Sequence, residues 1–255
     1  MKTLILDGSR ANDPQGVNIA NALRKHLPDA ETITLRDQKI GNCAGDFFCW
    51  VRSPGMCNTD DDNRLIAAKI IQSDLVVYLT PVTFGGYSFE LKRMVDHGIQ
   101  NISPFFTNIH GEIHHQKRYK RYPNLLVVGW MDSPNPQAES IFCHLVHRNA
   151  INMHVKTSVC GLVVGHQPEA ELISQTGLWL EAIASGSSSP VPALPTQAFS
   201  STDHAPIKRA VLLVGSPRTK KSTSASLGNY LFEQLTARGV ETETIQIYTS
   251  LNSPE

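Results

Sequence analysis

Two loops in this chain carry the residue types that bind phosphate. The first runs from Gly8 to Asp13, and the second, GSPRTKKSTS, runs from Gly215 to Ser224. Each follows an apolar run and precedes an amphipathic segment, which predicts a strand, a loop and then a helix. Such loops hold an anion on small hydroxyls, backbone N–H groups and the start of the helix. The candidate phosphate ligands are Ser9, Arg10 and Asn12 in the first loop and Ser216, Arg218, Ser222 and Thr223 in the second.

The two loops differ in charge. The second has basic residues and no acid, whereas the first ends in Asp13, which is unfavourable beside a phosphate. Neither loop places G-K-[ST] after a G-x-x-x-x spacer, so a nucleoside triphosphatase is not expected.

Histidines gather in the stretch IHGEIHH, residues 109–115, and His144 and His147 stand three residues apart. The chain has no H-E-x-x-H motif and no evident third ligand set for a metal. We therefore interpret the first group as an exposed polar loop and the second as a helix face. The short basic run of residues 119–122 favours a solvated loop over nucleic-acid binding.

Composition excludes several classes of protein. Lys plus Arg and Asp plus Glu number 23 each, so no nucleic-acid or anionic membrane partner is indicated. The apolar runs are shorter than the roughly 18 residues of a membrane-spanning helix. The first of them ends at Asp7 and is too short for a signal peptide. The five cysteines, an odd number in an α/β pattern, predict reduced thiols and a cytoplasmic protein.

Five apolar, strand-like runs alternate with segments of helical periodicity. This alternation predicts an α/β fold: a flavodoxin-like, doubly wound parallel sheet of five strands in the order 2-1-3-4-5. Residues 101–123 are polar, rich in histidine and left without an assignment. The expected strands are 3–6, 31–35, 74–79, 125–128 and 155–164, and the expected helices are 16–27, 65–71, 89–97, 137–150 and 169–184.

Three regions follow from this pattern. Residues 1–184 form the first domain, residues 185–206 a linker rich in Ser and Pro, and residues 207–255 an incomplete second unit of the same kind. Two strands and one helix cannot cover both faces of their own sheet. We therefore expect that the natural chain continues beyond Glu255 or that this unit packs on another element.

Two segments give the sequence a specific resemblance. CAGDFFCWVRSPGMCNTDD, residues 43–61, and SDLVVYLTPVTFGGYSFELKRMVDH, residues 73–97, stand with the first Gly-Ser loop. Together they resemble the NAD(P)H-dependent FMN reductase family of the flavodoxin superfamily, which includes iron–sulfur flavoproteins. The resemblance covers about residues 1–184, and the second start resembles the first unit of the same family.

The resemblance implies a flavodoxin-like oxidoreductase, often a dimer, that binds FMN at the carboxyl edge of its sheet. Ser9, Arg10 and Asn12 would then meet the phosphate. The isoalloxazine ring would lie along the loop after the third strand, with a further contact from the loop after the fourth. The residues expected at the ring are Pro81, Val82, Thr83, Phe84, Gly85, Gly129 and Trp130. No catalytic side chain is assigned, because the hydride chemistry belongs to the cofactor.

The cysteine segment has the pattern Cys43-x5-Cys49-x7-Cys57, with Asp46 where iron–sulfur relatives carry another Cys. A cluster normally requires four thiolates. Three interpretations stay open: a metal or cluster site completed by Asp46, a redox-sensitive pair of Cys43 and Cys49, or a structural cover beside the flavin. We expect the cover and no metal.

The sequence thus predicts an FMN-dependent NAD(P)H oxidoreductase that passes electrons to a quinone, a free flavin or another small-molecule acceptor, as a homodimer. Alternatives are an electron carrier that NAD(P)H does not reduce, and a flavin-free scaffold domain. In a longer tandem protein, the second unit would hold the working FMN site.

Overall fold

The computed structural model describes residues 1–194, 206–215 and 222–247. The chain divides into two compact units, Met1–Pro195 and Thr196–Glu255, which are described separately below. In the described part of the chain, no helix is long and apolar enough to cross a membrane.

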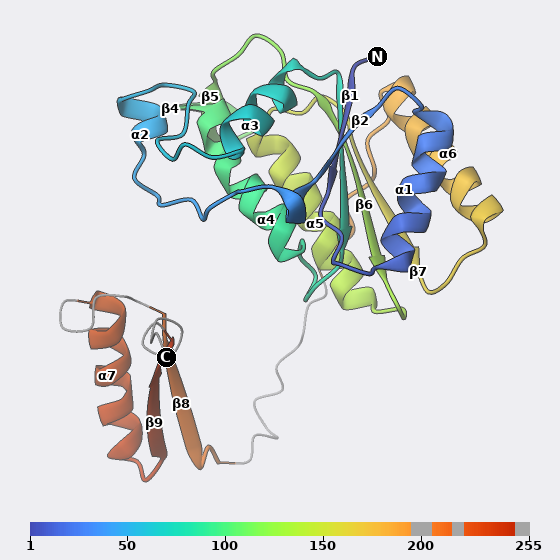
Figure 1. Cartoon of the computed structure of the whole chain (residues 1–255). Coiled ribbons are helices and arrows are strands. Elements are labelled where there is room, and N and C mark those ends of the chain that lie inside the picture. Colours follow the sequence, from blue (N-terminus) through green and yellow to red (C-terminus); the bar gives the residue numbers. More distant parts are fainter. Residues whose placement is uncertain (195–205, 216–221, 248–255) are drawn as a thin grey trace. The chain divides into compact units, whose positions relative to one another are not determined.

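A parallel sheet of five strands forms the centre of the first unit (Figure 1). The strand order is β2-β1-β3-β6-β7, which confirms the predicted flavodoxin-like order and fold class. The middle strand β3 is buried along its whole length, as expected for a parallel strand covered on both faces. The strands are β1 (Thr3–Asp7), β2 (Glu31–Thr34), β3 (Leu75–Pro81), β6 (Asn124–Met131) and β7 (Ser158–Val164).

Helices cover both faces of this sheet (Figure 1). Alternate residues of β3 serve opposite faces: Val76 and Tyr78 pack with one core cluster, and Leu75, Val77 and Leu79 with the other. The helices on the Tyr78 side are α3 (Asn63–Gln72), α4 (Phe89–Asp96) and α5 (Pro136–Asn152), and those on the other side are α1 (Pro14–His26) and α6 (Glu169–Ser185).

Residues 101–123 contain a structure that the sequence did not reveal. β4 (Ile102–Ile109) and β5 (Glu112–Lys117) form an antiparallel hairpin outside the main sheet. The expectation of an exposed polar loop is wrong for His114, which is 6% exposed. Its ring nitrogens contact Asn152 and Glu112, each at 2.8 Å. The sequence did not predict this hairpin because many of its residues are polar. Hydrogen bonds, as well as apolar packing, hold its buried face.

Short helices complete the first unit. They are η1 (Leu35–Asp37), α2 (Phe48–Val51) and η2 (His97–Asn101). Helix α2 lies within the cysteine segment, for which the sequence predicted no helix.

The chain beyond α6 stays on the first unit. Ser189 donates its N–H to the carbonyl of Ser158 at 2.9 Å and accepts the N–H of Cys160 on its hydroxyl at 3.0 Å. Ser140 donates to the carbonyl of Ala193 at 2.7 Å. Part of the segment expected as a poorly packed linker is therefore hydrogen-bonded to β7 and α5. The domain boundaries placed at residues 184 and 207 remain predictions.

The second unit contains β8 (Arg209–Val214), α7 (Thr223–Thr236) and β9 (Glu241–Gln246), with β8 and β9 parallel. Helix α7 packs closely at Gly228, where a Cβ would lie 2.4 Å from Leu212 Cδ2. Val211, Leu213 and Ile245 are exposed.

Candidate functional site

The loops after β1, β3 and β6 line one open groove of about 390 Å³ at the carboxyl edge of the sheet. The strand order reverses between β1 and β3, and open α/β sheets bind ligands at such a point. The groove brings together five of the residues expected at the site: Arg10, Asn12, Pro81, Val82 and Trp130. Its other lining residues are Ala11, Asp13, Pro14, Gln15, Met131 and Asp132.

Close packing fixes the start of the first loop. Gly8 donates its N–H to the carbonyl of Leu79 at 2.8 Å, and a Cβ there would lie 2.8 Å from Leu91 Cβ. Ser9 is 3% exposed, and both its N–H and its hydroxyl donate to the Asp7 carboxylate. The structure therefore does not bring Ser9 into the groove lining, and its phosphate contact remains a prediction.

The next three residues offer donors for an anion. The backbone N–H groups of Arg10, Ala11 and Asn12 have no hydrogen-bond partner among the described residues. Asn12 has a φ of 58°, which curves the loop. The guanidinium of Arg10 is exposed and donates to Thr83 Oγ1 at 3.2 Å. Successive free N–H groups beside a cation suit a phosphate.

Asp13 occupies the start of α1. It is the N-cap, and its Oδ1 accepts the N–H of Gly16 at 3.0 Å. Its Oδ2 accepts the indole N–H of Trp130 at 3.1 Å. Pro14 has no N–H to offer, so the usual anion site at a helix start is already filled by a carboxylate. A phosphate in this groove must use the donors of residues 10–12.

A tight turn follows β3. Thr83 and Gly86 exchange N–H···O bonds at 3.0 and 2.8 Å, and Phe84 and Gly85 between them have φ values of 50° and 75°. Two left-handed residues in succession are typical of a type I′ turn. The turn leaves the Phe84 ring fully exposed to solvent. An exposed aromatic ring beside the groove is suited to stacking on a planar ligand.

The residues after β6 are less accessible than expected. A Cβ on Gly129 would lie 2.7 Å from the Phe142 ring, so this glycine belongs to the core packing. Trp130 lines the groove but is only 3% exposed. Gln15 and Asp132 were missed from sequence. The position of Asp132 directly after a buried strand was the available signal, and Gln15 gave none.

The second candidate loop is described only at its end. Ser222 is the N-cap of α7 and accepts the N–H of Ala225 at 3.2 Å, while Thr223 is the first residue of the helix. Ser216 and Arg218 lie outside the described residues. Phosphate binding at this loop therefore remains a prediction.

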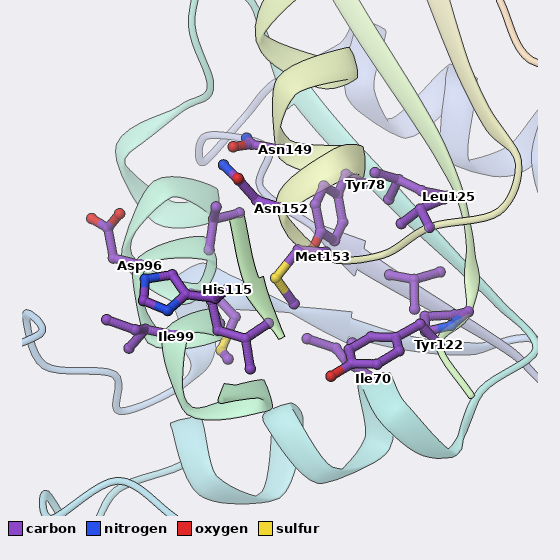
Figure 2. A pocket seen from close by; sticks show the side chains of 17 residues that line it. Ile70, Tyr78, Asp96, Ile99, His115, Tyr122, Leu125, Asn149, Asn152 and Met153 are labelled. Carbon is purple, nitrogen blue, oxygen red and sulfur yellow. The ribbon is translucent and has the colours of Figure 1, made fainter. Parts of the chain in front are cut away.

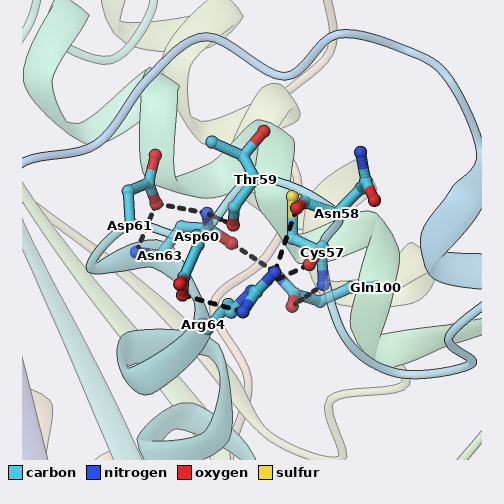
Figure 3. Close-up of polar contacts among 8 residues, drawn as sticks. All are labelled: Cys57, Asn58, Thr59, Asp60, Asp61, Asn63, Arg64 and Gln100. Atoms are coloured by element: carbon cyan, nitrogen blue, oxygen red, sulfur yellow. Dashed lines mark hydrogen bonds and ion pairs between the residues drawn. The ribbon is translucent and has the colours of Figure 1, made fainter.

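The three cysteines of the Cys43–Cys57 segment line a small hollow together with His97. Cys57 Sγ lies 3.6 Å from His97 Nδ1. Hydrogen bonds hold this end of the segment: Cys57 donates its N–H to Gln100 Oε1 at 3.0 Å, and Arg64 Nε donates to the Cys57 carbonyl at 2.9 Å (Figure 3). His97 is a buried neighbour of the thiols that sequence spacing did not reveal, because it lies 40 residues further along the chain.

The donor set of this hollow, three thiols and His97, lacks the four thiolates that an iron–sulfur cluster normally requires. The segment supplies three thiols, and Asp46 accepts the N–H of Phe48 at 3.0 Å. Across the described residues, no three His, Cys, Asp or Glu side chains are grouped so that they hold a metal ion. Burial and the neighbouring Cys57 and Cys43 thiols raise the pKa of Cys49, so it stays protonated at neutral pH.

The fold and groove define a flavodoxin-like protein, and comparison with known proteins shows what its N-terminal part is similar to. Residues 1–111 match the family model described as NADPH-dependent FMN reductase, which confirms the resemblance seen in the sequence. This segment carries the first loop, the cysteine segment and the Thr83–Gly86 turn.

Two curated relatives match a shorter part. An iron–sulfur flavoprotein of Methanocaldococcus jannaschii is 33% identical over 76 residues, 30% of this chain and 38% of the relative. An iron–sulfur flavoprotein of Archaeoglobus fulgidus is 32% identical over 78 residues, 31% of this chain and 37% of the relative. The match thus spans less than two fifths of the length of either protein.

Solved structures share the fold. The NAD(P)H:quinone oxidoreductase of Methanothermobacter marburgensis has a TM-score of 0.52 at 12% identity, over 69% of this chain and 95% of its own. A quinone reductase homologue from Klebsiella pneumoniae has a TM-score of 0.50 at 12% identity, over 72% and 84%. At this identity the likeness establishes the flavodoxin-like fold.

Proposed function

We propose that the first unit binds FMN in the groove and acts as an NAD(P)H-dependent oxidoreductase toward a small-molecule acceptor such as a quinone or a free flavin. The observation that carries the proposal is the meeting of the loops after β1, β3 and β6, joined by the hydrogen bond from Arg10 to Thr83. The match of residues 1–111 to the FMN reductase family supports it.

Two groups of residues fit the two parts of FMN, its phosphate and its flavin ring. The free N–H groups of residues 10–12 and the Arg10 guanidinium would hold the phosphate. Pro81, Val82 and the Thr83–Gly86 turn would line the flavin ring and exclude water from one side of it. Bound FMN supplies hydride acceptance from a nicotinamide and onward electron transfer, so the chain needs no acid–base residue for that chemistry.

The test is the absorbance spectrum of protein that has been incubated with FMN and desalted, before and after anaerobic NADH or NADPH. Retained flavin bands that bleach with either nucleotide are expected. Arg10→Gln should lower FMN retention. Arg24→Gln is the matched control, because Arg24 is exposed on α1 and, among the described residues, donates only to Asn21. Equal retention by both variants would contradict the phosphate assignment.

Two other outcomes point to other functions. Retained flavin that neither nucleotide bleaches identifies an electron carrier. A colourless protein identifies a flavin-free scaffold, which the Asp13 carboxylate in the groove favours, or a working FMN site in the second unit of a longer tandem protein. A longer protein that retains FMN only through its second unit would support the second possibility.

The assembly and the cellular setting stay predictions. We propose a homodimer in the cytoplasm with no nucleic-acid or membrane partner. Light scattering on the purified chain tests the dimer, and a monomeric mass at micromolar concentration would contradict it.

A further inference from the structure

A second cavity of about 290 Å³ lies inside the first unit, on the sheet face covered by α3, α4 and α5 (Figure 2). Its walls come from the early parts of β3 and β6, from η2, from α5 and from the hairpin residue His115. It is smaller and more enclosed than the groove at the carboxyl edge. Its volume lies just below the 300–1,000 Å³ typical of pockets for small molecules.

This cavity is separate from the FMN groove. It uses Val76 and Leu125, which are paired in the sheet, whereas the groove uses Pro81 and Trp130, a pair five residues further along both strands. Five residues of a parallel strand span about 16 Å, and Tyr78, the lining residue of β3 nearest the groove, is three residues or about 10 Å of strand before Pro81. A ligand here would therefore leave the proposed flavin site unoccupied.

Tyr78 lines the cavity and has a hydroxyl without a protein partner in the described part of the chain. Its side chain is 8% exposed. Buried phenols normally find a partner. The other tyrosines nearby do: Tyr87 accepts the Asn149 amide at 3.1 Å, and Tyr122 donates to the Asn101 carbonyl at 2.6 Å. Burial raises the pKa of Tyr78 to about 12, so its hydroxyl is a neutral donor.

Other polar atoms of the cavity lining can also form further hydrogen bonds. His115 Nδ1 is buried without a partner among the described residues. Asn152 Oδ1 contacts His114 Nδ1 at 2.8 Å, and the Asn152 amide nitrogen has no partner among the described residues. Figure 2 shows Asn149 and Asn152 close together on one side of the lining, with His115 and Tyr78 on different sides of the space.

The rest of the wall is apolar. Its apolar residues include Ile70, Met94, Ile99, Leu125 and Met153. Asp96, the carboxylate in the lining, is paired with Lys92. A charged ligand would lose its hydration without gaining a free counter-ion, which is costly. The cavity therefore suits an uncharged, mainly apolar molecule with few polar atoms.

We propose that this cavity binds a small uncharged ring compound that bears a carbonyl oxygen, with the Tyr78 hydroxyl as hydrogen-bond donor to that oxygen. A volume of about 290 Å³ admits one six-membered ring with a short substituent. His115 Nδ1 and the Asn152 amide belong to residues that also line the cavity, and either could contact a second polar atom on a larger ligand.

Methionine-methyl NMR tests the site with defined probes. Acetophenone carries the ring and the carbonyl, and ethylbenzene has nearly the same shape without the oxygen. Of the five methionines, Met94 and Met153 line the cavity and Met131 lines the groove. Acetophenone is expected to shift the Met94 and Met153 signals and to leave Met131 unchanged. FMN, added separately, reports on Met131, so failure of one site is distinguishable from failure of the other.

Tyr78→Phe then tests the donor. The variant should bind acetophenone about five- to tenfold more weakly than the wild-type protein and ethylbenzene equally well within twofold, because one hydrogen bond is lost. Its thermal midpoint should not fall, since no partner of the hydroxyl is removed. Gly98→Leu should block both probes, because a Cβ at Gly98 is already 3.6 Å from the sulfur of Met153.

Three results would overturn the proposal. The first is acetophenone at millimolar concentration that leaves Met94 and Met153 unshifted, which would identify a site filled by water. The second is equal affinity of the wild-type protein for the two probes. The third is binding that survives Gly98→Leu in a folded protein. If Tyr78→Phe does not fold, the comparison of the two probes on the wild-type protein still decides the matter.

Discussion

Trp130 donates its indole N–H to the carboxylate of Asp13 at 3.1 Å, across 117 residues of sequence. The bond ties the end of β6 to the loop after β1. The indole also lies against α1, where a Cβ on Gly16 would be 2.9 Å from Trp130 Cζ2. Both oxygens of Asp13 are thus in use, one by the helix start and one by the indole.

This arrangement makes the charge of Asp13 testable separately from its capping role. Asp13→Asn keeps one side-chain oxygen, which caps helices well, but places an amide nitrogen where the second oxygen accepts the Trp130 N–H. It removes a negative charge from the groove, and we expect the ratio of FMN to riboflavin affinity to rise about three- to tenfold, the scale of one charge–charge contact near a surface. Riboflavin lacks the phosphate, so this ratio, measured by fluorescence titration, isolates the phosphate contact. Asp29→Asn, just beyond the other end of α1, is the matched control and should leave the ratio unchanged.

Gly85→Ala should lower the free energy of unfolding by about 2 kcal/mol or more, because alanine is strained at a positive φ and its Cβ would lie 2.8 Å from Ile141 Cγ2. Urea denaturation measures the change. Phe84→Ala is the control for stability: this ring is fully exposed, so the change should stay within about 0.5 kcal/mol. Phe84→Ala should nevertheless weaken FMN binding if the ring stacks on the flavin. A stable Gly85→Ala protein would show that the turn is not fixed as described.

The ion pair between Glu112 and Arg148 joins the hairpin to α5, and its contribution to stability depends on pH. Hydrogen bonds from Arg148 and His114 lower the pKa of Glu112 to about 2. A carboxylate with a lowered pKa stabilises the fold above its unfolded-state value near 4.3 and loses that contribution as the pH falls toward 2. The wild-type protein should therefore be more stable than Glu112→Gln at pH 6, and the difference should shrink between pH 4.5 and 2. A difference in urea midpoint that does not depend on pH would contradict this.

Asp46→Cys should give the cysteine segment the fourth thiolate that it lacks. After reconstitution with iron and sulfide, we expect the wild-type protein to hold less than stoichiometric iron and Asp46→Cys to hold more, with a new charge-transfer absorbance. Asp46→Ser is the control, because it can still accept the N–H of Phe48 without adding a thiol. Stoichiometric iron or zinc in the wild-type protein as purified would overturn our view of this segment.

The sequence predicted the parts of the fold that depend on continuous apolar runs. Val76 to Leu79 and Leu125 to Val128 are buried on both faces, and such runs allow few other interpretations. The hairpin escaped prediction because His114 is buried through hydrogen bonds to residues on β5 and α5. In the site, the residue types of the first loop, Gly8 to Asp13, predicted that it lies beside Pro81. They did not predict the orientation of Ser9, whose hydroxyl donates to Asp7 two residues away. Contacts at long sequence separation, such as His97 with Cys57, have no local pattern from which to predict them.

Residues 187–193, which follow α6, also affect whether another chain can pair with the edge of the sheet. Strand β7 is an outer strand of the sheet, and outer strands with unpaired backbone groups invite a strand from a neighbouring molecule. Ser189 already donates its N–H to the Ser158 carbonyl and accepts the Cys160 N–H on that strand. Removal of residues 187–193 would uncover these groups, and the first unit would then be more prone to edge-to-edge aggregation.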